Sequence, residues 1–374
     1  MVKVSLKLLI PSIILLFTLN NSNFSSYSLN VNEANGTSSD ITISTLSSAS
    51  ILSDKNPYLE KIIFENATNG EEFAAKNALS GYIVNAVNEQ IEQKYFKANY
   101  IKNLSHNLHS IMIGSSHMLP VSYIDVGSEN YANLSIGGSN LQDRLDILGM
   151  LDYYNVEYEH VIFEIDLPSF LDNALATRNG QLFQEFGNRF YNKLSGDTLG
   201  TISEIDFNSK YVSNYAFDIL LKNVYNETQI LDSIYYYRPD ASMIYPKRSE
   251  LFNDEHVNKV YLILRQQDEM LKNAHASETS KIIILKIMEY FKKNNKKVNL
   301  IIAPRPNREF DESVMKDYPI LQEVTEFATT IAKAYGFKLS GSFNPHDLWL
   351  TDNEFVDGFH LRGDVTSRIF EFIE

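Results

Sequence analysis

Four short apolar runs constrain the fold of this chain more than any other feature. They span residues 109–113, 131–136, 160–166 and 298–303, and each is followed within two residues by glycine or proline. Between the second and third runs, the stretch NLQDRLDILGMLDYYN (140–155) repeats leucine at helical spacing. Apolar strands that alternate with helices are typical of a parallel sheet covered on both faces, so the sequence predicts the α/β class.

The composition supports a packed globular protein and argues against binding to nucleic acid. Of the 374 residues, 44% are hydrophobic, which is ample for a core. The formal net charge is -14, whereas phosphate binding needs a clustered excess of Lys and Arg. The basic run KKNNKK (292–297) is interpreted as a solvated turn, so we expect no nucleic-acid partner.

The N-terminus has the layout of an export signal. Lys3 and Lys7 precede or flank an apolar run at 8–19, which is short for a membrane span. Cleaved signal and uncleaved anchor both stay open for residues 1–19, with membrane association through this segment in the second case. We expect an extracytoplasmic protein, either secreted or anchored at the outer face of the cytoplasmic membrane.

Residues 20–55 are dominated by Asn, Ser and Thr and are expected to form a disordered linker, because they bury too little apolar surface to offset ordering. The chain has no cysteine, which excludes disulfides and a lipid-modified cysteine and fits a bacterial cell-envelope protein. Residues 56–374 are then expected to form the folded domain.

Two stretches of this domain interrupt the strand and helix alternation. Residues 57–103 have a helical pattern, with Ile83, Val84 and Ile91 on the apolar face of an expected amphipathic helix. The interval from about 173 to 280 is rich in Tyr and Phe and later turns helical. We expect it to be a largely helical insertion that packs over the sheet or over the site.

Polar residues follow the first two apolar runs, where an open α/β sheet binds its ligands. The first run leads into IGSSHM (113–118), in which Ser115 or Ser116 is either a nucleophile or the cap of the next helix. The second apolar run leads into GGSN (137–140). Gly138 there either presents its N–H to an oxyanion or is simply a glycine of the kind common in strand-to-helix turns. Two such turns on consecutive strands favour a site.

Near the C-terminus, FVDGFHLRGD places Asp357 three residues before His360. This spacing lets a carboxylate bind one imidazole nitrogen while the other faces a nucleophile. The alternative is that Asp357 caps the last helix and that His360 is an ordinary surface residue.

In their order along the chain, IGSSHM, NLSIGGSN and DGFHL resemble the blocks of the SGNH/GDSL hydrolase superfamily. The resemblance covers roughly residues 105–170 and 296–374. It implies a three-layer, flavodoxin-like parallel sheet with helices on both faces, and a serine-dependent acyl hydrolase or acyltransferase. No metal or other cofactor is implied.

The resemblance also assigns roles to single residues. Ser116 matches the nucleophile, with Ser115 in the place of the usual aspartate. His360 matches the base and Asp357 the acid that orients it, while the N–H groups of Ser116 and Gly138 match the oxyanion donors.

One block of the family is missing. After the third run the chain reads EIDLP (164–168), without the Gly-x-Asn whose amide gives relatives a third oxyanion donor. Asn140 is one candidate replacement, and a carboxylate at Asp166 would disfavour an oxyanion if it pointed into the site.

Other candidates are weighed against plainer interpretations. His117 and Arg305 are candidate substrate contacts, but a helix-start histidine and a surface arginine are the alternatives. His346 and Asp347 precede Asp357, but their spacing matches no compact metal motif, so we expect no metal.

The N-terminal segment and the insertion make the envelope-facing branch of the superfamily the nearest resemblance. That branch includes D-alanine transfer proteins and enzymes that move acyl groups on or off exported polysaccharides. The expected partner is an acyl ester of a cell-wall polymer or polysaccharide. The alternative, favoured by the missing block, is an inactive envelope binding or scaffold protein with the same fold.

Overall fold

The computed structural model describes part of the chain, namely residues 70–85, 93–104, 107–176, 181–199, 201–202, 220–222, 236–245, 271–306, 318–356 and 359–371. The leader and linker predicted for residues 1–55 lie outside the described residues, and so does Asp357. Within the described ranges, no helix is both long enough and apolar enough to cross a membrane.

A five-stranded parallel sheet forms the centre of the described structure, in the order β3-β2-β4-β8-β9. Its strands are β2 (Leu108–Ile113), β3 (Tyr131–Asn133), β4 (Tyr158–Glu164), β8 (Lys297–Ile302) and β9 (Lys338–Gly341). Numbered within the sheet, the order is 2-1-3-4-5, which is compatible with a flavodoxin-like fold. The four apolar runs are β2, β3, β4 and β8, as predicted, whereas β9 was not anticipated.

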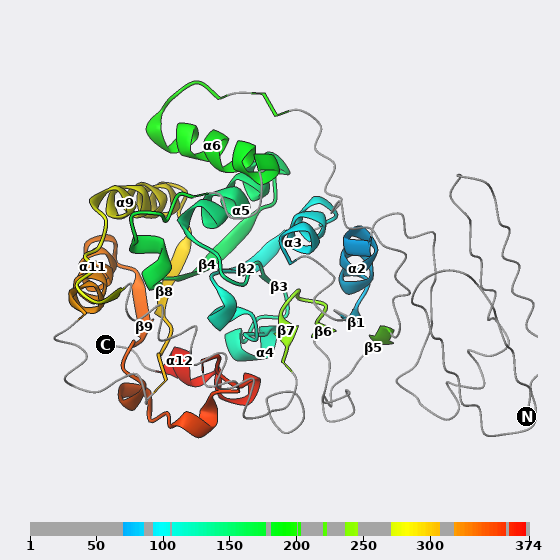
Figure 1. Cartoon of the computed structure of the whole chain (residues 1–374). Coiled ribbons are helices and arrows are strands. Elements are labelled where there is room, and N and C mark those ends of the chain that lie inside the picture. Colours follow the sequence, from blue (N-terminus) through cyan, green and yellow to red (C-terminus); the bar gives the residue numbers. More distant parts are fainter. Residues whose placement is uncertain are drawn as a thin grey trace, which may run out of the picture. The chain divides into compact units, whose positions relative to one another are not determined.

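Helices connect the strands on both faces of this sheet (Figure 1). Those that follow β3, β4 and β8 are α5 (Leu141–Tyr153), α9 (Glu278–Lys293) and α11 (Pro319–Tyr335). The shorter α4 (Tyr123–Val126) and α12 (Arg368–Glu371) pack on the opposite face. The predicted α/β class, with a parallel sheet flanked by helices, is therefore confirmed.

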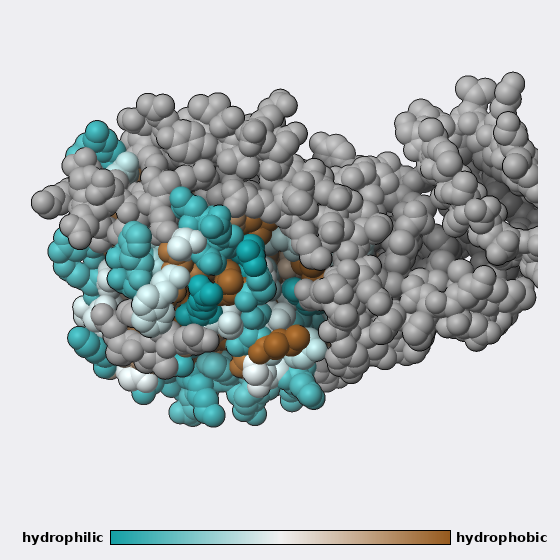
Figure 2. Space-filling view, turned by 90° about the horizontal axis from the view of Figure 1, so that it is seen from below, coloured by the Kyte–Doolittle hydropathy of each residue, from teal (hydrophilic) through white to brown (hydrophobic). Residues whose placement is uncertain are grey.

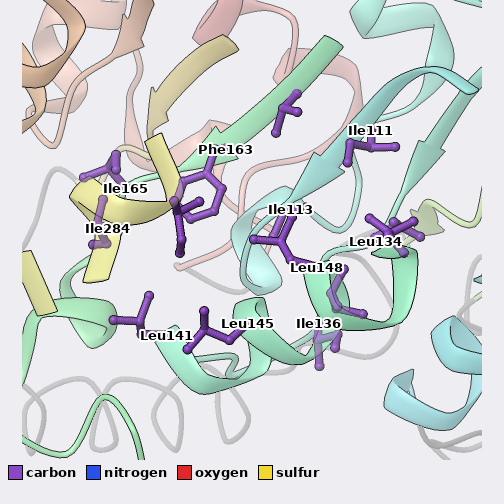
Figure 3. Close-up of a cluster of buried hydrophobic side chains, with 14 of the residues drawn as sticks. Ile111, Ile113, Leu134, Ile136, Leu141, Leu145, Leu148, Phe163, Ile165 and Ile284 are labelled. Atoms are coloured by element: carbon purple, nitrogen blue, oxygen red, sulfur yellow. The ribbon is translucent and has the colours of Figure 1, made fainter. Parts of the chain in front are cut away.

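Alternate strand residues belong to two different cores, which shows directly that both faces are covered. On β2, Ile111 and Ile113 enter the larger core beneath α5, while Met112 enters the smaller one. On β4, Phe163 likewise faces α5 and α9, whereas Ile162 faces the C-terminal segment. Figure 3 shows the larger core, where strand and α5 side chains interdigitate.

A second, antiparallel sheet has the order β5-β1-β6-β7. It consists of β1 (Tyr82–Asn85), β5 (Leu220–Lys222), β6 (Tyr236–Tyr237) and β7 (Met243–Ile244). The helical prediction for 57–103 is correct for α2 (Gly70–Leu79) and α3 (Gln93–Lys102) but wrong for β1 between them. Ile83 and Val84 pair with β5, and Val84 also pairs with β6. The sequence did not predict this strand because a short apolar run does not distinguish the period of a strand from that of a helix.

The interval 173–280 contributes helix and strand alike among its described residues. Helix α6 (Gln181–Ser195) packs on α5, and the approach is so close that a Cβ on Gly149 would lie 2.2 Å from the Phe186 carbonyl oxygen. Strands β5, β6 and β7 also come from this interval. Most of the stretch predicted to turn helical, 258–275, lies outside the described residues.

The two sheets are joined by a buried lysine on α3. Lys97 is fully buried, and its ammonium nitrogen donates to the carbonyl oxygens of Asn133, at 2.5 Å, and of Ala241. The first oxygen ends β3 and the second lies between β6 and β7. Burial lowers the pKa of Lys97 to about 7, although the Asp240 carboxylate partly opposes this shift. Near neutral pH, the folded protein therefore contains both the charged and the uncharged form of this amine, and the uncharged form still has two N–H groups for the two hydrogen bonds.

We predict that the free energy of unfolding rises with pH above about 7 because of Lys97. The amine has its ordinary pKa of 10.5 in the unfolded chain and about 7 in the folded protein, so the unfolded state binds more protons between these values. One such group contributes a slope of up to about 1.4 kcal/mol per pH unit. Urea unfolding between pH 7 and 10 should show a smaller slope for Lys97→Met than for the wild type.

Lys333→Met, at an exposed position on α11, is the matched control and should keep the wild-type slope. Equal pH slopes for Lys97→Met and the wild type would contradict the prediction, whatever the overall loss of stability in the variant.

Candidate active site

The turn after β2 separates the two serines. Ser115 is buried and is the N-cap of a short 3-10 helix, η2 (Ser116–Met118), since its hydroxyl accepts from the His117 N–H at 3.4 Å. Ser116 is half-buried, and its Oγ lies 2.8 Å from His360 Nε2. The capping interpretation thus applies to Ser115, while Ser116 has the contact that a nucleophile needs with a base.

His360 is placed by a tight strand-like turn in the C-terminal segment. Phe355 and Leu361 form an isolated antiparallel bridge, and the Val356 N–H donates to the His360 carbonyl oxygen at 2.7 Å. Phe355 and Leu361 are both buried in the smaller core. Asp357 lies outside the described residues, so its role as the orienting acid stays a prediction.

Glu164, the last residue of β4, lies beneath the turn that follows β2 and contains Ser115. Its side chain is fully buried and accepts hydrogen bonds from the Ser115 N–H and, at 3.1 Å, from the Ser115 hydroxyl. The turn approaches so closely that a Cβ on Gly114 would lie 2.7 Å from Glu164 Oε2, which is why glycine is needed there.

The charge of Glu164 is compensated from several sides. Burial alone would raise the pKa of this carboxyl, but His117, the Arg144 guanidinium and the Ser115 N–H together hold it below its usual range. His117 Nδ1 is 3.6 Å from Glu164 Oε1, and Arg144 Nη2 is 3.6 Å from Oε2. Glu164 is therefore an ionised group at the carboxyl edge of the sheet.

Asp166 follows β4 by two residues, in the stretch where the sequence lacks a Gly-x-Asn. It caps η3 (Leu167–Phe170) by accepting from the Ser169 N–H, and its Oδ1 lies 2.7 Å from Arg144 Nη2 as an ion pair that lacks hydrogen-bond alignment. Burial raises the pKa of Asp166, with Arg144 opposing the shift and Glu164 adding to it. This carboxylate is engaged by Arg144 and by η3.

The turn after β3 contains Gly138 and Asn140. Gly138 adopts the left-handed backbone conformation, with φ 64, which favours glycine. Asn140 is buried at the N-cap of α5, where its Oδ1 accepts from the Asp143 N–H and its Nδ2 donates to the Ala176 carbonyl oxygen at 2.9 Å. Its amide would have to give up these partners to contact an oxyanion or a substrate.

Two further side chains hold the nucleophile turn, and neither was singled out by sequence reasoning. The buried Asn133 amide donates to the carbonyl oxygens of Met118, Leu119 and Val121 at 2.7, 3.3 and 2.8 Å. Tyr245, which follows β7, donates from its hydroxyl to the Ser116 carbonyl oxygen at 2.8 Å. The insertion thus reaches the site, and a tyrosine-rich composition was the one signal pointing to it.

The remaining candidates are less closely tied to Ser116. Arg305 follows β8 at the same edge of the sheet, and its N–H donates to the Phe343 carbonyl oxygen at 3.0 Å. His346 is exposed on η6 (Pro345–Leu348). Among the described residues, no group of three or more His, Cys, Asp or Glu side chains could hold a metal ion.

Among the residues coloured in Figure 2, most of those on the face seen from below are hydrophilic, and a few hydrophobic residues are visible between them. In comparisons with known proteins, no family model and no curated protein matches the chain. The geometry at this edge of the sheet is therefore the structural basis for inferring a function.

We predict that Asn133→Leu destabilises the protein by about 1–3 kcal/mol, because three buried carbonyl oxygens each lose one of two donors and the buried Ser135 N–H loses its acceptor, Asn133 Oδ1. Asn130→Leu is the matched control, since the exposed Asn130 amide donates to a single carbonyl oxygen, that of Asn107. Urea unfolding measures both variants. If Asn133→Leu lowers the free energy of unfolding no more than Asn130→Leu does, the Asn133 amide does not stabilise the turn after β2.

Proposed function

We propose that this protein is a serine-dependent acyl hydrolase or acyltransferase of the SGNH type. The observation that carries the proposal is the 2.8 Å contact between Ser116 Oγ and His360 Nε2, two residues from opposite ends of the domain. A parallel sheet of order 2-1-3-4-5, with the serine on the turn after its first strand, is compatible with that fold.

The proposed chemistry begins with proton transfer from Ser116 Oγ to His360 Nε2 as the oxygen attacks an ester carbonyl. The N–H groups of Ser116 and Gly138 are the oxyanion donors that the family resemblance assigns. Collapse of the tetrahedral intermediate releases an alcohol and leaves the acyl group on Ser116. Water or an acceptor hydroxyl then takes the acyl group, and Ser116 regains its proton.

For the substrate, we propose ester-linked acyl groups of a cell-wall polymer or exported polysaccharide. Support comes from the export-type N-terminal pattern and from the resemblance to the envelope-facing branch of the superfamily. The location that goes with this proposal is extracytoplasmic, with the protein either secreted or anchored at the outer face of the cytoplasmic membrane.

A second candidate is an envelope binding or scaffold protein without activity. The specific observation in its favour is the replaced third block, where Glu164 and Asp166 are committed to Arg144 and no Gly-x-Asn amide is present. The contact between Ser116 and His360 argues against it, because a binding protein has no need of a paired serine and imidazole.

Ser116→Ala should abolish labelling by a fluorophosphonate probe and slow hydrolysis of an activated acyl ester by about 10³-fold or more, since the attacking oxygen is lost. Thermal unfolding should stay close to that of the wild type, because Ser116 is only half-buried. Labelling is read by intact mass and its position by peptide mapping.

Ser128→Ala, at a half-buried serine between α4 and β3, is the control and should label as the wild type does. A wild-type protein that is never labelled, or a label that maps to Ser115, would overturn the assignment. Incubation with O-acylated wall polymers, followed by mass spectrometry of the released or transferred acyl group, identifies the substrate.

A further inference from the structure

A second imidazole lies beside the first. The ring centroid of His117 is 5.7 Å from that of His360 and 4.5 Å from that of Phe359. The His117 side chain is 19% exposed, so it is partly accessible to solvent, as is the half-buried Ser116. His117 directly follows Ser116 in the chain, and the C-terminal segment brings the His360 ring next to the His117 ring.

One edge of the His117 ring is held from inside the protein. Nδ1 lies 3.0 Å from Ser115 Oγ, and this hydroxyl donates to Glu164 Oε1 at 3.1 Å. Since the hydroxyl proton goes to the carboxylate, the Ser115 oxygen accepts from His117 Nδ1–H. The resulting chain, carboxylate to hydroxyl to imidazole, orients the ring as an aspartate orients a catalytic histidine.

Nδ1 is held by Ser115 and lies near Glu164, so Nε2, across the ring from Nδ1, is the nitrogen that remains for contact with a substrate. A buried anion 3.6 Å from the ring also offsets a positive charge on it. His117 thus has the orientation and the electrostatic support of an acid–base group, in a site where His360 already serves Ser116.

We propose that the two histidines divide the proton transfers, with His360 serving Ser116 and His117 serving the oxygen that leaves or enters. In acylation, His360 Nε2 takes the Ser116 proton and keeps it, while protonated His117 Nε2 donates to the leaving alcohol oxygen as its bond to the acyl carbon breaks. In the second half, neutral His117 takes the proton of the attacking water or sugar hydroxyl. His360 then returns its proton to Ser116 Oγ, so the protons balance and both rings are restored.

This inference rests on the proposed function, because it assigns a second role within the same site. Glu164 and Ser115 act as positioning residues for His117. The division of roles suits an acyltransferase in particular, since the acceptor hydroxyl then meets a base that is not occupied with Ser116.

The test is the dependence of His117→Gln on the leaving group. Fluorophosphonate labelling and the acylation burst with an activated aryl ester need no proton on the leaving group, so both should stay within about threefold of the wild type. Cleavage of an unactivated alkyl ester, and turnover after the burst, should fall by about 10²–10⁴-fold, the usual contribution of general acid–base catalysis. His117→Phe keeps a ring beside Phe359 and should show the same split, which separates packing from proton transfer.

His275→Gln, which alters an exposed histidine paired with Glu323 at 2.6 Å, is the matched control and should change neither reaction. Wild-type cleavage of the alkyl ester by His117→Gln would overturn the inference, and so would an equal loss of labelling and alkyl ester cleavage. Absence of labelling in the wild type would instead refute the proposed function, so the two failures are distinguishable.

Discussion

The buried carboxylate of Glu164 is the interaction on which the catalytic edge of this molecule depends. A fully buried charge is tolerated only where it is paired and hydrogen-bonded, and Glu164 has Arg144 on one side and the N–H and hydroxyl of Ser115 on the other. These partners come from α5 and from the turn after β2, whereas Glu164 itself ends β4. One charged group therefore ties two strands and a helix together at the point where the candidate nucleophile stands.

The different surroundings of the two serines follow from this constraint. Ser115 is drawn inward because both its backbone and its side chain bind Glu164, and this leaves Ser116 at the rim with its hydroxyl against His360. The carbonyl groups of the turn are held separately, by Asn133 from β3 and by Tyr245 from the insertion. A short turn with a single 3-10 helix, η2, is thus fixed from three directions, which is the rigidity that a positioned nucleophile requires.

The second sheet shows why part of the fold could not be predicted from the sequence. Ile83 and Val84 fit a helical pattern as well as a strand, because a run of this length contains too few apolar positions to establish a period. Their partners decide the matter, and these lie far along the chain: Ile83 pairs with Leu221, and Val84 with Leu220 and Tyr237. The four strands recognised in advance belong to the parallel sheet, where burial on both faces makes each run apolar throughout.

By itself, the sequence determined the α/β class and nominated Ser116 and His360, because strand alternation is a local pattern and the motifs keep their order along the chain. Only the tertiary structure decided which serine meets the imidazole and what compensates Glu164, and only it brought Tyr245 to the turn. The physical reason is separation along the chain: the contacts of Ser115 with Glu164, of Tyr245 with Ser116 and of His360 with Ser116 span 49, 129 and 244 residues. No local pattern encodes such contacts, because they exist only after the strands have aligned their carboxyl ends at one edge of the sheet.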